Sequence, residues 1–148
     1  MDETRIVAKF EKNAQEMIFV GVNHWQEKWR CFIRVYYPGT EKSEDWLPTK
    51  KGISLDLVHF PELQSAIYDL GTDLETEREV AVINKGAAQE IRINLSSFKK
   101  IKLINIRTYV KIDGEWNPTQ KGVSLKPDLF PALCDGIEKL AKMIPELI

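Results

Sequence analysis

The sequence predicts an α+β protein made of two tandem ββββα units that pack on each other as an intramolecular pseudo-dimer. The first observation behind this prediction is a ten-residue motif that occurs twice. The second is that runs of β-branched and aromatic residues precede each copy, and the third is that an apolar stripe at helical spacing follows it. Strands followed by a single helix are typical of an antiparallel sheet in an α+β fold.

The repeated motif is W-x-P-T-x-K-G-x-S-L, and its two copies are identical at seven of ten positions. The copies are WLPTKKGISL (46–55) and WNPTQKGVSL (116–125). Shorter matches flank them: AQE at 14–16 and 88–90, FIRVYY at 32–37 and NIRTYV at 105–110, and FPEL at 60–63 and FPAL at 130–133. Self-similarity on this scale indicates an internal duplication.

These matches divide the chain into repeats at 4–70 and 80–148. The segment between them, GTDLETERE at 71–79, is typical of a helix C-cap followed by an acidic linker. A unit of about 65 residues is marginal alone, because it buries only about 60% of its surface. We therefore expect the two units to pack together; two independent beads are the alternative.

Strands are expected wherever β-branched and aromatic residues cluster. In the first repeat these runs are Ile6–Phe10, Ile18–Val22, Trp29–Tyr37 and a short fourth strand at Gly52–Leu55. Its counterpart in the second repeat is Gly122–Leu125. The composition of PGTEKSED (38–45) predicts a loop, and the Asp-Gly of KIDGE (111–115) predicts a hairpin.

An apolar stripe at helical spacing closes each repeat. The two stripes are Phe60, Leu63, Ile67 and Leu70, and Phe130, Leu133, Ile137 and Leu140. Pro61 and Pro131 fall in the first turn, where a missing N–H costs little. Gly71 and Pro145 mark the expected helix ends. We expect both stripes to lie in the core or between the repeats.

The composition excludes several classes of protein. The 148 residues are 43% apolar and 29% charged, as in an ordinary globular protein. No window approaches about 18 uncharged apolar residues, so no transmembrane helix is expected. The start, MDETRIVAKF, lacks the apolar region of a signal peptide. Cys31 and Cys134 have no paired spacing, which argues against a disulfide framework and favours a reducing, cytoplasmic location.

No pattern in the sequence indicates catalysis or metal binding. His24 and His59 have no ligand spacing around them. Nucleophile-elbow, phosphate-loop, dinucleotide and zincin motifs are all missing. We therefore expect no enzyme, no cofactor and no metal.

The near-neutral total charge hides an uneven distribution. The net charge is −1, but residues 83–148 carry 11 Lys/Arg against 7 Asp/Glu, a net of +4. A net of −1 argues against coating of nucleic acid by bulk charge alone. The basic second half nevertheless leads us to expect it to dominate the electrostatics of any groove.

The K-G-I/V-S-L string, which lies between a Pro-containing loop and an amphipathic helix, resembles the family of transcriptional coactivators called positive cofactor four (p15). An aromatic residue nine positions before the Arg of I-R-x-Y strengthens the resemblance. The resemblance implies a curved four-stranded antiparallel sheet with a C-terminal helix, dimerisation, and single-stranded DNA bound across the sheet. It also implies that the second repeat replaces the homodimer partner. Because no targeting signal is recognised, we expect a bacterial cytoplasmic protein that associates with the nucleoid.

The resemblance further implies a set of DNA-contacting residues. They are the stacking aromatics Trp25 and Phe98, the arginines Arg34 and Arg107, a second aromatic at Tyr37, and the lysines Lys50, Lys51 and Lys121. In the second repeat Val110 replaces Tyr37 and Gln120 replaces Lys50. The residues themselves add Lys99 and Lys100, because cations beside an aromatic on a turn suit single-strand binding. Strand alternation puts Tyr37 on the face opposite Arg34.

The expected function is single-stranded DNA binding with little sequence preference, in transcription regulation or in replication and repair. Transcription or replication proteins would be further partners. One alternative is a protein-interaction module of the transcription machinery, which the pI near 6.2 favours. Single-stranded RNA is another possible ligand, because stacking alone does not exclude ribose. For the residues, Trp25 and Phe98 could instead fill the sheet core or the interface between the repeats. Arg34 and Arg107 could form structural ion pairs, with the acidic linker as one candidate partner.

Overall fold

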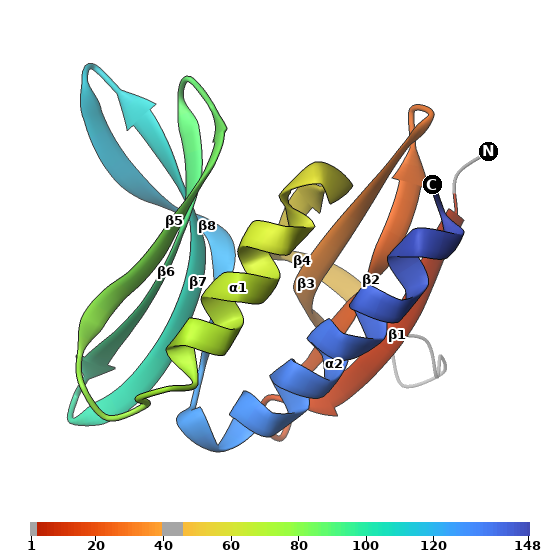
Figure 1. Cartoon of the computed structure of the whole chain (residues 1–148). Coiled ribbons are helices and arrows are strands. Elements are labelled where there is room, and N and C mark those ends of the chain that lie inside the picture. The colour runs from red at the N-terminus through yellow and green to blue at the C-terminus, as the bar shows by residue number, and fades with distance from the viewer. Residues whose placement is uncertain (1–2, 40–45) are drawn as a thin grey trace.

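A computed structural model describes residues 3–39 and 46–148, and it confirms the predicted fold class (Figure 1). Two four-stranded antiparallel sheets have the strand orders β1-β2-β3-β4 and β5-β6-β7-β8, and a helix follows each sheet. The first repeat contains β1 (Glu3–Glu11), β2 (Met17–Trp25), β3 (Lys28–Pro38), β4 (Trp46–Asp56), a 3₁₀ turn (Leu57–His59) and α1 (Phe60–Leu70). The second contains β5 (Arg78–Gly86), β6 (Gln89–Phe98), β7 (Ile101–Ile112), β8 (Glu115–Leu125), a 3₁₀ turn (Pro127–Leu129), α2 (Phe130–Met143) and a final 3₁₀ turn (Ile144–Glu146).

The fourth strand is longer than the sequence predicts. It begins at Trp46 instead of Gly52, so the Pro-Thr dipeptide lies within a strand. Proline is tolerated there because β4 is the last strand of its hydrogen-bonded sheet. Of the predicted loop at 38–45, Pro38 ends β3, and residues 40–45 lie outside the described part of the chain.

A β-bulge follows the proline in both repeats. The pairing of β3 with β4 shifts between Arg34 and Tyr36, and the Thr49 hydroxyl bridges the gap. Thr49 Oγ1 donates to the carbonyl of Val35 (2.8 Å) and accepts from the N–H of Lys51 (3.0 Å). Thr119 makes the same two bonds in the second repeat. The threonine of the repeated motif therefore fixes a bulge by replacing ladder hydrogen bonds.

Each helix packs against strands of the other repeat. Helix α2 lies on β1 and β2, and α1 lies on β5, while β4 runs beside β8 (Figure 1). At Gly136 of α2 a Cβ atom would lie 3.1 Å from Val20 Cγ2 and 3.4 Å from the Cβ of Ala8, both in the first sheet. The two repeats therefore share one core, as the predicted pseudo-dimer requires.

The shared core is one continuous apolar cluster. It joins the inward-facing residues of both sheets to the predicted stripes of both helices. Its fully buried members include Ile33, Ile106, Ile67 and Ile137. Cys31 is also buried, and burial raises the pKa of its thiol to about 12. This cysteine is therefore a small core residue with little thiolate character.

Gly71 ends α1 as predicted, but a left-handed cap is not the reason for the glycine. Its φ is −69°, in the right-handed region. A Cβ atom at this position would instead lie 2.6 Å from Cζ of Phe130, at the start of α2. Gly71 therefore leaves room for the other helix. No helix within residues 3–39 and 46–148 is long and apolar enough to cross a membrane.

We predict that Gly136→Leu destabilises the whole chain by about 1–3 kcal/mol, because the added side chain forces α2 away from Val20 and Ala8. Urea unfolding monitored by circular dichroism measures the change. Glu138→Leu, on the exposed face of the same helix, is the control and should change stability little. A Gly136→Leu protein as stable as the wild type would show that α2 does not pack tightly on the first sheet.

Candidate nucleic-acid interface

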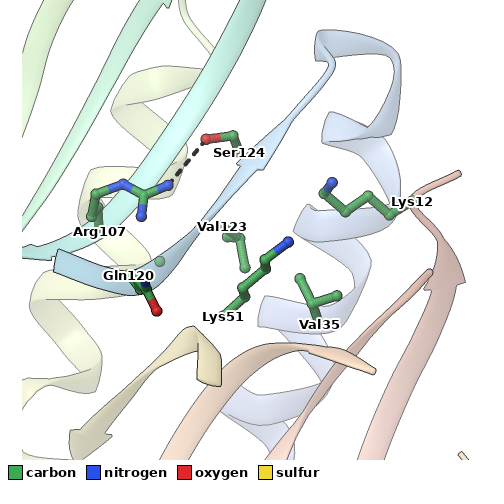
Figure 2. A pocket seen from close by; sticks show the side chains of 8 residues that line it. Lys12, Val35, Lys51, Arg107, Gln120, Val123 and Ser124 are labelled. Carbon is green, nitrogen blue, oxygen red and sulfur yellow. Dashed lines mark hydrogen bonds between the residues drawn. The ribbon is translucent and has the colours of Figure 1, made fainter. Parts of the chain in front are cut away.

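Two pockets lie between the repeats and are related by the internal duplication. The first, of about 250 Å³, is the Arg34 pocket, lined by Arg34, Thr49, Lys50, Gly52, Ser54, Lys85, Thr108 and Lys121. The second, of about 430 Å³, is the Arg107 pocket, lined by Lys12, Val35, Lys51, Arg107, Gln120, Gly122, Val123 and Ser124 (Figure 2). Neither lining contains an acidic residue.

Each pocket takes its cations from both repeats. Arg34 comes from the first repeat and meets Lys85 and Lys121 of the second. In the other pocket, Arg107 of the second repeat meets Lys12 and Lys51 of the first. Figure 2 shows Lys12 and Lys51 on one side of the Arg107 pocket and Arg107 on the other. Neither repeat alone therefore builds a complete pocket.

The glycine of the repeated motif makes room for the arginine. Gly52 pairs with Arg34 across β3 and β4, and Gly122 pairs with Arg107 across β7 and β8. A Cβ atom on Gly52 would lie 2.7 Å from the Cα of Arg34, and one on Gly122 would lie 2.8 Å from the Cβ of Arg107. Close backbone approach, not a special φ, therefore requires glycine at both positions.

The two arginines differ in how they are held. Arg107 Nη1 donates to the carbonyl of Thr119 (2.8 Å), and Nη2 lies 3.4 Å from Ser124 Oγ (Figure 2). The Arg34 guanidinium instead lies 5.6 Å from the ring centre of Phe32. Within residues 3–39 and 46–148, neither arginine is in an ion pair, so the predicted alternative of pairing with the linker is not seen there.

The sheet face that carries the pocket arginine, here called the groove face, has different side chains packed on it in the two repeats. In the first repeat Phe19 stacks on Tyr36 with ring centres 4.1 Å apart, and Trp46 lies 6.4 Å from Phe19. In the second repeat Arg92 occupies the position of Phe19 and lies over the rings of Tyr109 (4.2 Å) and Trp116 (6.0 Å). Both tryptophans therefore pack over the sheet.

Trp25 and Phe98 lie exposed at the ends of β2 and β6. The two residues are 51% and 64% exposed, so they do not fill the core. Each stands before a two-residue turn in which both residues have positive φ although neither is glycine. The turn after Trp25 contains Gln26 (52°) and Glu27 (63°), and the turn after Phe98 contains Lys99 (51°) and Lys100 (67°). This left-handed conformation is unfavourable for residues with a Cβ. Lys99 Nζ lies 5.4 Å from the ring centre of Phe98, which is a cation–π distance.

Other cations near these turns are already paired. Lys28 and Arg30 both contact the carboxylate of Asp56, at 2.9 and 3.1 Å. Lys102 contacts Glu75 in the acidic segment between the repeats, at 2.9 Å. The charge that remains available near the second turn therefore lies on Lys99 and Lys100.

The structure brings together some of the predicted residues and separates others. Arg34, Lys50 and Lys121 share one pocket, and Arg107 and Lys51 share the other. Tyr37 is 44% exposed and lies apart from Arg34 by alternation, because the β2–β3 register is unbroken and the bulge lies in β4.

Sequence reasoning missed Lys12 and Lys85. Lys12 stands seven residues before Phe19, which pairs with Arg34, and Lys85 stands seven residues before Arg92, which pairs with Arg107. Each lysine therefore has the same place relative to the arginine of its own repeat, with the same spacing of 73 residues between the repeats. That shared spacing was the signal available in the sequence. Within the described part of the chain, no group of three or more His, Cys, Asp or Glu residues could hold a metal ion.

Comparisons with known proteins agree with a duplicated family domain. The profile of the family described as Transcriptional Coactivator p15 (PC4) matches residues 12–66 and 85–136. The chain therefore belongs to the PC4 family, and the two segments are consistent with two tandem copies.

Among solved structures, the chain is similar to a PC4 homolog from Burkholderia pseudomallei K96243. Its orthorhombic form shows 26% identity over 47% of this chain and 95% of that chain, with a TM-score of 0.41. Its tetragonal form shows 27% identity over 45% of this chain and 98% of that chain, also with a TM-score of 0.41. A search of curated proteins gave no match.

We predict that replacing either strained turn by Asn-Gly stabilises the protein. Lys99→Asn with Lys100→Gly, and separately Gln26→Asn with Glu27→Gly, should each raise the free energy of unfolding by about 0.5–1 kcal/mol, because Asn-Gly suits this turn. Urea unfolding measures both pairs. Lower stability in both would show that the positive φ values carry no strain.

Proposed function

We propose that this chain binds single-stranded DNA with little sequence preference, in transcription regulation or in replication and repair. The observation that carries the proposal is the Arg34 pocket, where Arg34, Lys50, Lys85 and Lys121 from both repeats converge. Cations along a groove combined with exposed stacking aromatics are what sequence-independent binding of single strands requires. Membership of the PC4 family supports the same ligand, because PC4 domains bind single-stranded DNA.

In this proposal the residues have two roles. Trp25 and Phe98 stack on bases, since their rings are exposed at the hairpin tips. Phosphates are held by Arg34, Lys50, Lys51, Lys99, Lys100, Arg107 and Lys121, to which the structure leads us to add Lys85 and Lys12. The contact proposed for Tyr37 stays a prediction from the resemblance. Binding of this kind needs no catalytic group, and we propose none.

The charge of the pockets sets the expected response to salt. Each phosphate contact with a single strand contributes about −0.7 to the slope of log affinity against log salt. The four cations in the Arg34 pocket are therefore expected to contribute about −3 to this slope, and further phosphate contacts make it steeper. A protein-interaction module without nucleic-acid binding would show no such dependence.

We predict that Trp25→Ala combined with Phe98→Ala removes most of the affinity and leaves the fold intact. Each lost stack costs about 1–3 kcal/mol, so the pair should weaken binding by at least roughly 30-fold. The measurement is fluorescence anisotropy of a labelled oligo-dT of about 20 nucleotides at several salt concentrations.

The control is Val58→Ala combined with Ile112→Ala, two exposed apolar residues away from these turns, which should not affect binding. Oligo-U of the same length tests RNA, and duplex DNA tests strand selectivity. Loss of the folded circular dichroism spectrum in the Trp25 and Phe98 variant would make those aromatics structural. Absence of binding by the wild type at low salt would refute the proposed function.

A further inference from the structure

The two pockets are equivalent by duplication but carry different available charge. Lys85 corresponds to Lys12, Lys121 to Lys51, and Arg34 to Arg107. Lys50 has no charged counterpart, because Gln120 stands in its place. The Arg34 pocket therefore has four cations in its lining, whereas the Arg107 pocket has three.

A carboxylate beside the Arg107 pocket widens this difference. Glu16 Oε1 lies 3.3 Å from Lys12 Nζ, and Oε2 lies 3.9 Å from Lys51 Nζ. Asn13 Nδ2 donates to Glu16 Oε1 at 2.8 Å and holds the carboxylate in place. That hydrogen bond, aided by the charge of Lys12, keeps the pKa of Glu16 below its ordinary value, so the group is ionised at neutral pH.

All three cations of the Arg107 pocket thus have a partner within the protein. Lys12 and Lys51 face Glu16, and Arg107 donates to the Thr119 carbonyl. A phosphate entering this pocket has to compete with the Glu16 carboxylate, which already contacts two of the pocket's lysines. Competition from a fixed anion lowers the affinity for a second anion.

The Arg34 pocket has no equivalent carboxylate. Strand register makes Gln89 the counterpart of Glu16, since Met17 pairs with Tyr36 and Glu90 with Tyr109. Gln89 lies in the pocket adjoining Lys85 and is neutral. Asp56 is nearby, but it already contacts Lys28 and Arg30.

Lys85 is a partly buried cation beside a second lysine. Burial lowers the pKa of its ammonium group, the neighbouring charge of Lys121 lowers it further, and the charge of Asp56 acts in the opposite direction. Within the described residues, Lys85, Lys121 and Arg34 form no ion pair. An anion that enters this pocket therefore meets cations with no competing carboxylate in contact.

We propose that the Arg34 pocket is the primary phosphate site of the chain and that Glu16 acts as a built-in competing anion that makes the Arg107 pocket the weaker, secondary site. A single strand then fills the Arg34 pocket before the Arg107 pocket, whereas two equal pockets would fill together. The phosphodiester backbone of a single strand is the ligand class. This proposal rests on the proposed function and specifies which half of the duplicated site performs it.

The test exchanges the two counterpart residues in the full chain. Gln89→Glu installs a carboxylate at the Arg34 pocket, and Glu16→Gln removes the one at the Arg107 pocket. Gln64→Glu and Glu138→Gln on the helices make the same changes of net charge away from both pockets. The probe is an oligo-dT of about eight nucleotides, short enough to occupy one pocket at a time.

The amide resonances of Gly52 and Gly122 report separately on the two pockets, because each glycine lines one of them. In the wild type, the oligonucleotide should shift Gly52 at concentrations that still leave Gly122 unmoved. Glu16→Gln should make Gly122 respond as well. Gln89→Glu should lower the affinity about tenfold at low salt, a loss that shrinks as salt screens the added charge.

Equal shifts of Gly52 and Gly122 in the wild type would overturn the proposal, as would Gln89→Glu and Gln64→Glu having equal effects. If no oligonucleotide binds at all, the proposed function fails instead. Inorganic pyrophosphate then tests the inequality of the pockets alone: a shift confined to Gly52 supports it, and equal shifts or none refute it.

Discussion

Burial of each sheet beneath the helix of the other repeat is the constraint on which the rest of the structure depends. Helix α2 covers β1 and β2, and α1 covers β5, so the apolar faces of the two repeats form one cluster. A unit of about 65 residues gains too little burial to be secure alone, and this exchange supplies the missing contacts. The same packing sets β4 beside β8, and both inter-repeat pockets lie along that seam. The separation between an arginine of one repeat and a lysine of the other is therefore fixed by the core.

The repeated motif is explained by the local geometry of this seam. Its threonine closes the β-bulge, its lysine follows the bulge into a pocket, and its glycine lets the strand pass close to the arginine. Its leucine, Leu55 or Leu125, returns to the core. Each of these four motif residues thus has its own structural role within one short stretch of chain. The groove face is less constrained, and there the repeats differ: an aromatic stack around Phe19 in one, and Arg92 over Tyr109 in the other.

The sequence was enough to predict the fold class, because strand and helix periodicities repeat on either side of the motif. The start of the fourth strand was predicted wrongly, since Pro48 signals a turn unless its strand is known to be the last of its sheet. The match of AQE at 14–16 with 88–90 is out of structural register by one residue, and it aligns Glu16 with Glu90 instead of Gln89. That alignment hides the difference in charge between the pockets. Lys12 and Lys85 were missed because similarity within a repeat does not show which residues meet across an interface.

Joining both halves in one chain changes how the site responds to mutation. In a symmetric homodimer every substitution occurs twice, so a change that improves one groove is imposed on the other. Here Lys121 belongs to one pocket and Lys51 to the other, and each position varies by itself. Gln120 stands at the position equivalent to Lys50, and Gln89 at the position equivalent to Glu16. Identical subunits could not contain such differences. Because the two pockets vary independently, one pocket of the chain can keep its ligand while the other pocket is free to acquire a different one.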